Sequence, residues 1–159
     1  WLAVYLPLSL GLLWLSARRF ARYTVTAGIV SLARGVTLLA TGLGVPDPAH
    51  AGPGIAGHDP LQAFAELLSP WQVFAKDAMA AYLTKDLFFS GHTATTFLIL
   101  LYLWPYRRLR GLAVAGHLAV VASVFLAHLH YTIDVIGAYA VAIAVFALRE
   151  GWPPRRAAP

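Results

Sequence analysis

Three polar side chains in two short segments have the types and spacing needed for proton transfer and for transfer chemistry at phosphorus. His92 lies in the segment Ser90-Gly91-His92-Thr93, and His130 and Asp134 lie in a later segment, 128–134. If a helix begins by His130, the i,i+4 spacing places His130 and Asp134 on one face. The carboxylate would then fix the imidazole tautomer and make the other ring nitrogen a better nucleophile or base. His92 could supply a proton, so the set suffices without a metal.

Other interpretations of these residues have different weights. A histidine near the end of a membrane span is often only an interfacial residue, so each histidine alone is a weak signal. An Asp in an otherwise apolar helix is costly and usually functional. A metal site formed by His128, His130 and Asp134 is a weaker alternative, because His128 and His130 point about 200° apart on a helix. The sequence therefore predicts neither a metal nor another cofactor.

The composition sets the kind of fold that must position these residues. Of the 159 residues, 59% are apolar and 12% are charged, whereas soluble domains average about 45–50% and about 25%. The composition therefore argues against a water-soluble globule. The absence of Cys excludes disulfides and thiol nucleophiles. The net charge of +5 is explained by basic residues in cytoplasmic loops and requires no nucleic acid partner.

The apolar residues fall into five runs, at about 1–17, 23–45, 87–104, 111–129 and 131–148. Each is near the ~20 residues that cross a bilayer. We predict an all-α, polytopic transmembrane helix bundle that forms one integral-membrane catalytic domain over residues 1–159. The segment 46–84 is predicted to be an outer loop with two short interfacial helices, divided at Pro70. The chain opens at Trp1 inside an apolar run, which we interpret as a truncated span and not a signal peptide.

The basic residues predict the orientation of this bundle. Nine of the twelve Lys and Arg residues lie in three segments that alternate so as to share one membrane face: Arg18, Arg19, Arg22; Arg107, Arg108, Arg110; Arg149, Arg155, Arg156. The positive-inside rule makes this face cytoplasmic. His92, His130 and Asp134 are then expected on the extracytoplasmic side. The compact, Ala- and Arg-rich chain suggests a bacterial inner membrane.

Both histidine segments resemble a known family. Segments 86–93 and 127–135 resemble the two signature segments of sphingomyelin synthases, a branch of the lipid phosphatase/phosphotransferase superfamily named after type 2 phosphatidate phosphatases. Residues 33–37 followed by Val45-Pro46 are similar to an earlier Tyr-Arg and Leu-Pro segment of that family. The resemblance runs from about Arg18 to Tyr139. The family has six spans, which implies that its first helix precedes Trp1 or is absent.

The resemblance implies a role for each residue of the triad. His130 matches the histidine that attacks the phosphorus of a phospholipid head group and becomes the phosphoryl-enzyme, and Asp134 matches its orienting carboxylate. His92 matches the acid that protonates the departing diacylglycerol and later deprotonates the acceptor. The acceptor is ceramide or diacylglycerol in a transferase such as sphingomyelin or ceramide phosphoethanolamine synthase, and water in a lipid phosphatase. A non-catalytic lipid-binding membrane protein is a further alternative, against which the intact triad argues.

The chain departs from the wider superfamily in the residues that hold phosphate. It has no Lys-x6-Arg-Pro segment, and Ser123 is followed by Val124 where an Arg is expected. Arg34, within a span, is the best substitute, because a mid-span Arg costs ~2.5–3.5 kcal/mol on insertion scales and should have a partner. The alternative is a buried ion pair of Arg34 with Asp86 or Asp134.

Four further residues complete the predicted set. Asp86 matches a family Asp, and Ser90 and Tyr131 lie inside the two signature segments, so all three are candidates for substrate binding. His117 lies about two turns inside the fourth span, where we expect a packed, hydrogen-bonded histidine.

Overall fold

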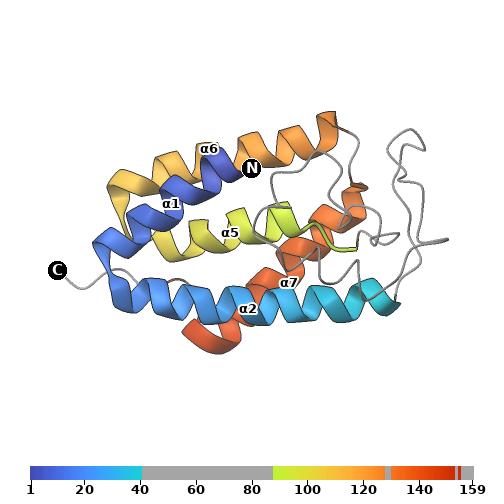
Figure 1. The fold of residues 1–159 in the computed structure, drawn as a ribbon, viewed down its shortest axis with the longest axis horizontal. Helices are drawn as coiled ribbons and strands as arrows, with labels where there is room; N and C mark the ends of the chain where they lie inside the picture. Colours follow the sequence, from blue (N-terminus) through green and yellow to red (C-terminus); the bar gives the residue numbers. More distant parts are fainter. Residues whose placement is uncertain (41–87, 128–129, 153, 155–159) are drawn as a thin grey trace, which may run out of the picture.

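The computed structural model describes residues 1–40, 88–127, 130–152 and 154, and the regular secondary structure of this part of the chain is all α-helix (Figure 1). It contains five α-helices: α1 (Leu2–Leu15), α2 (Ala17–Ala40), α5 (Gly91–Leu103), α6 (Arg107–Leu126) and α7 (Thr132–Glu150). The prediction of an all-α fold is therefore confirmed for these residues. The expected outer loop 46–84, with its interfacial helices, lies outside the described residues, as do Asp86 and His128.

Helix α5 is the centre of the bundle. It packs against each of the other four described helices, and Figure 1 shows it enclosed between α1 and α6 above and α2 and α7 below. Leu98, Ile99 and Leu103 of α5 are fully buried. A helix that is apolar on every side is stable only when it is covered all round, so α5 forms the core on which the site is built.

The outer helices present an apolar surface. Large apolar side chains are exposed on α1, α2, α6 and α7, among them Leu10, Leu32, Leu126 and Leu148. Exposed apolar area of this extent is typical of a surface that faces lipid or a partner and not water. The pattern agrees with a bundle whose exterior is solvated by hydrocarbon.

Two of the described helices, α6 and α7, are long and apolar enough to cross a membrane. Helices α1 and α5 are apolar but have 14 and 13 residues, which corresponds to roughly 20 Å against a hydrocarbon core of about 30 Å. Two helices thus support the prediction of a membrane-type helical bundle, without regard to the number of spans. The number of spans stays a prediction.

The boundary between the first two helices differs from the prediction. α2 begins at Ala17 and not near residue 23, because the Ser16 side chain accepts a hydrogen bond from the Arg19 N–H at 3.3 Å. A serine in this position caps the first turn of a helix, and Arg is itself a good helix former. α6 likewise begins earlier than predicted, at Arg107 instead of near residue 111, although no side chain caps it. The first two of the three predicted basic segments are therefore the first turns of helices, whereas Arg149 of the third lies in the last turn of α7.

The two ends of the bundle differ in charge. The turn between α1 and α2, the turn between α5 and α6 and the end of α7 lie together at the left in Figure 1. We call this the basic end, because it holds seven of the nine predicted residues: Arg18, Arg19, Arg22, Arg107, Arg108, Arg110 and Arg149. Arg155 and Arg156 are outside the described residues. The beginnings of α5 and α7, with His92 and His130, lie at the opposite end, which we call the histidine end.

Candidate active site

The capped start of α5 positions the first histidine, His92. Ser90 is the N-cap, and its hydroxyl oxygen accepts hydrogen bonds from the Thr93 N–H at 3.4 Å and from the Thr93 hydroxyl at 3.1 Å. This places His92 in the first turn, half-buried. Ser90 itself is fully buried. Its hydroxyl, predicted as a candidate for substrate binding, therefore faces the helix that it caps.

The second histidine precedes α7 instead of lying on it. α7 begins at Thr132, so the expectation that this helix starts by His130 is wrong. The contact that followed from it is nevertheless present, with His130 Nδ1 and Asp134 Oδ2 3.3 Å apart. Asp134 is in the first turn, where its Oδ2 also accepts the Tyr131 N–H at 2.8 Å. The Asp134 carboxylate thus both caps α7 and orients the His130 imidazole.

This geometry leaves one ring nitrogen of His130 available. Asp134 is fully buried and His130 is 6% exposed. Because Nδ1 faces the carboxylate, Nε2 is the nitrogen that can attack. Asp134 Oδ1 is buried and makes no hydrogen bond to another described residue. A buried carboxylate of this kind can hold positive charge on the imidazole as it forms.

The two signature segments are joined to each other through the backbone. The Ser90 N–H donates to the Asp134 carbonyl oxygen at 3.1 Å. Gly137, one turn further along α7, allows the Phe88 ring to approach, because a Cβ at this glycine would lie 2.9 Å from two ring atoms. The rings of His92 and His130 lie next to each other in an edge-on arrangement, with centroids 6.5 Å apart and planes at 67°.

Arg34 of α2 holds the same segment from the other side. Its Nε donates to the Phe89 carbonyl oxygen at 3.0 Å, and Thr37 Oγ1 donates to the Phe88 carbonyl oxygen at 2.9 Å. A Cβ at Gly91 would lie 3.2 Å from Arg34 Nε, so the glycine of Ser-Gly-His makes room for the guanidinium. The alternative ion pair of Arg34 with Asp134 is not formed, since Asp134 pairs with His130.

A pocket of about 350 Å³ opens beside His92 between α2 and α5. Arg34, Gly91 and His92 line it, together with Ser31 and Trp1. The Trp1 ring meets the His92 ring edge-on at 5.3 Å. Ser31 is three residues before Arg34 on α2, and this spacing could have identified it from sequence. No pattern pointed to Trp1.

The electrostatics of the site favour an anion and a neutral nucleophile. Helices α5 and α7 both begin here, and helix N-termini carry partial positive charge, to which Arg34 adds a full charge. Burial lowers the pKa of the His130 imidazole, the nearby Asp134 carboxylate opposes this, and the Arg34 charge lowers it further. His130 is therefore uncharged at neutral pH, the form in which a histidine acts as nucleophile.

The remaining predicted residues lie as follows. Tyr131 is exposed, and its backbone N–H is what contacts Asp134. His117 is buried in the core, with Nδ1 2.9 Å from Thr96 Oγ1 and Nε2 2.8 Å from the Tyr139 hydroxyl. The prediction of a packed, hydrogen-bonded histidine is thus confirmed. Within the described ranges, no three His, Asp or Glu side chains are grouped to hold a metal ion.

Part of the chain matches a known protein family. Residues 85–150, which include His92, His130 and Asp134, match the family model described as "PAP2 superfamily C-terminal". Comparisons with curated proteins and with solved structures found no match. Members of this superfamily are phosphatases and phosphotransferases. The match over this C-terminal part of the chain supports membership in the superfamily of type 2 phosphatidate phosphatases and, with it, an enzyme of the lipid phosphatase/phosphotransferase type.

Proposed function

We propose that this protein transfers phosphoryl-containing head groups of membrane phospholipids through a phosphohistidine at His130. The observation that carries the proposal is the arrangement of His130, oriented by Asp134, opposite His92 at 6.5 Å between ring centroids. Nucleophile, orienting group and proton donor are thereby held on two helix starts that are hydrogen-bonded to each other.

In the first step His130 Nε2 attacks the phosphorus of the donor phospholipid. A nitrogen–phosphorus bond forms, and the bond between phosphorus and the diacylglycerol oxygen breaks. His92 gives its proton to that oxygen, so that neutral diacylglycerol leaves. The charge that develops on the His130 ring is balanced by Asp134, whose second oxygen has no hydrogen bond to another described residue.

In the second step His92, now neutral, takes the proton of an acceptor hydroxyl. The acceptor oxygen attacks phosphorus, the nitrogen–phosphorus bond breaks, and His130 returns to its starting state. Arg34 and the starts of α5 and α7 hold the phosphate oxygens in both steps, because guanidinium and helix N-termini bind phosphate well. The pocket beside His92 gives the head group a place next to Arg34.

We assign the activity to the sphingomyelin synthase-like branch, with ceramide or diacylglycerol as acceptor. The support is the resemblance of segments 86–93 and 127–135 to that family's signatures. Water as acceptor, which would make the protein a lipid phosphate phosphatase, uses the same residues and is the second candidate. The absence of a Lys-x6-Arg-Pro segment favours the first, because that segment serves the phosphate in the wider superfamily.

The proposed setting is a membrane in which the histidine end faces the extracytoplasmic side. The charge of the basic end supports this orientation through the positive-inside rule. A Cys placed at exposed Thr132 should react with a membrane-impermeant thiol reagent in intact cells, and a Cys at Arg108 should not. The reverse pattern would move the site to the cytoplasmic leaflet.

The activity is tested by giving the purified protein, in nanodiscs, a panel of phospholipids with and without ceramide. Lipid mass spectrometry should show a head group on ceramide and released diacylglycerol, and a donor labelled in its phosphate should label the protein. His130→Ala should lose both turnover and label, whereas the matched control Thr132→Ala should keep both.

The other outcomes are equally informative. Release of the head group to water, with no product on ceramide, would select the phosphatase. Substantial turnover in a folded His130→Ala protein would remove the covalent mechanism. Bound lipid without turnover in the wild type would make the chain a lipid-binding protein.

A further inference from the structure

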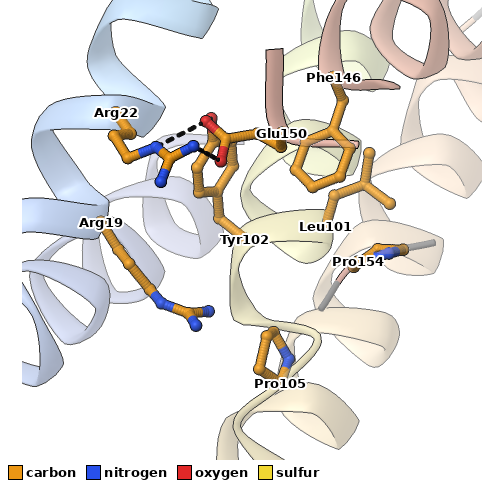
Figure 2. Close-up of a pocket in the computed structure, with 8 residues that line it drawn as sticks. All are labelled: Arg19, Arg22, Leu101, Tyr102, Pro105, Phe146, Glu150 and Pro154. Atoms are coloured by element: carbon orange, nitrogen blue, oxygen red, sulfur yellow. Dashed lines mark hydrogen bonds and ion pairs between the residues drawn. The ribbon is translucent and has the colours of Figure 1, made fainter. Parts of the chain in front are cut away.

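A second pocket lies at the basic end, far from the histidines. It has a volume of about 160 Å³ and is enclosed by α2, α5 and α7 (Figure 2). One side is apolar, with Leu101, Pro105 and Phe146. The other side carries Arg19, Arg22 and Glu150.

Among the described lining residues, the one carboxylate is already neutralised. Glu150 Oε1 accepts hydrogen bonds from Arg22 Nε at 3.0 Å and from the Tyr102 hydroxyl at 2.8 Å, and its Oε2 is 2.6 Å from Arg22 Nη2. Two of the three Arg22 nitrogens are thus used by Glu150. Figure 2 shows the third nitrogen pointing away from the carboxylate, on the side where Arg19 lies.

Arg19 supplies a second cation that no described carboxylate balances. Its guanidinium lies over the Tyr106 ring, 5.4 Å from the centroid, and the only ion pair that the described part of the pocket contains is that of Arg22 with Glu150. In Figure 2 the Arg19 side chain extends into the pocket. With two arginines and one glutamate, the described lining has one excess positive charge.

We propose that this pocket binds a phosphate oxyanion between the guanidinium of Arg19 and the remaining nitrogen of Arg22. The planar guanidinium matches the spacing of phosphate oxygens, and basic pockets between membrane helices bind anionic head groups. The site is separate from the proposed catalytic one and does not depend on it.

The surroundings of the pocket indicate how a lipid phosphate would reach it. Trp14, Trp104 and Trp152 end α1, α5 and α7 at this end of the bundle and are exposed. Tryptophans gather at head-group depth in membranes, so the pocket lies where a phospholipid presents its phosphate. Inorganic phosphate carries the same chemistry, and the experiment distinguishes the two sources.

The test uses the full chain in phosphatidylcholine nanodiscs and measures thermal unfolding with two probes. One probe is phosphatidylglycerol added to the bilayer, and the other is inorganic phosphate at constant ionic strength. Arg19→Gln is compared with Arg18→Gln, a matched control because Arg18 is exposed on the same turn and does not line the pocket. Binding at the histidine end raises the melting temperature equally in both variants, so only their difference reports on this pocket.

At least one of the two probes should raise the melting temperature of the wild type and of Arg18→Gln. Arg19→Gln should bind this probe roughly tenfold more weakly, which is the loss expected for one charge-assisted contact. A difference seen with phosphatidylglycerol assigns a lipid ligand, and one seen only with inorganic phosphate assigns the free ion. Equal responses of the two variants to both probes would overturn the proposal. If Arg19→Gln does not fold, Arg19→Lys against Arg18→Lys makes the same comparison, because lysine keeps the charge and loses the planar fork.

Discussion

Replacing Gly137 by alanine should weaken the hydrogen bond from the Ser90 N–H to the Asp134 carbonyl oxygen, which joins the two histidine segments. A Cβ at this position would lie 2.9 Å from Cε2 and Cζ of Phe88 and 3.3 Å from Cβ of Phe89. Ordinary contact begins near 3.4 Å, so the Phe88 ring must retreat by about 0.5 Å, an estimate from steric overlap. Phe88 and Phe89 lead directly into Ser90, and the retreat therefore pulls the Ser90 N–H away from the Asp134 carbonyl oxygen.

The magnitude follows from two opposing effects. Overpacking a filled site costs about 1–3 kcal/mol, and alanine in place of glycine inside a helix contributes about 1 kcal/mol. The net free energy of unfolding should fall by roughly 0–2 kcal/mol. A misplacement of 1 Å can cost about a hundredfold in rate, so the half-ångström shift should lower kcat by about tenfold.

Gly28 of α2 provides the matched control, because a Cβ there meets nothing within 4 Å. Gly28→Ala should raise stability by up to about 1 kcal/mol and leave turnover unchanged. For a chain of this length 1 kcal/mol corresponds to about 2–4 °C in Tm, so the two variants should melt about 2–12 °C apart. If Gly137→Ala melts together with Gly28→Ala and turns over like the wild type, the packing argument is refuted.

Three further predictions concern single side chains. Arg34→Lys should lower turnover, and vanadate should no longer raise the melting temperature of this variant. The reason is that lysine keeps the charge but not the planar fork that binds phosphate oxygens in pairs. A normal rise in melting temperature with vanadate would contradict a phosphate role. Because burial lowers the pKa of His130, its neutral form persists as pH falls, and the acid limb of the kcat/KM profile should lie below the ordinary imidazole pKa of 6.5. Asp134→Asn should move that limb lower still, since the carboxylate opposes the shift, and a limb that moves upward would show that another group titrates. His117→Ala leaves the buried Thr96 hydroxyl and the half-buried Tyr139 hydroxyl without their histidine partner. The free energy of unfolding should fall by about 1–3 kcal/mol, with turnover per folded molecule retained, and an unchanged Tm would contradict this.

Local patterns in the sequence predicted some elements well. The long apolar runs at α6 and α7 were placed within a few residues, since an uninterrupted apolar stretch between polar segments has few alternatives in a membrane. The start of α2 was missed because the arginines that follow Ser16 were interpreted as a loop by charge alone. The hydroxyl of Ser16 and the helix propensity of Arg decide that boundary.

At the site, contacts within one segment could be predicted and those between segments could not. The four-residue spacing of His130 and Asp134 predicted their contact, although capping of α7 and not a shared helix face brings it about. The bond from Arg34 to the Phe89 carbonyl joins residues 55 positions apart. No periodicity carries such a contact, and the Gly91 that makes room for it has the same sequence signal as any turn glycine.

The candidate site is built from α2 and from the later segment that runs from just before α5 into α7. This division affects how the specificity of the site can change. Both histidines and the carboxylate come from the contiguous segment that begins just before α5, whereas Arg34 and most of the far wall of the adjoining pocket come from α2. If the protein has the proposed function, reaction type and head-group choice are therefore encoded by separable stretches of the chain. Exchanging α2 alone, with the Arg34 bond to the Phe89 carbonyl retained, should produce enzymes that run the same chemistry on different lipids.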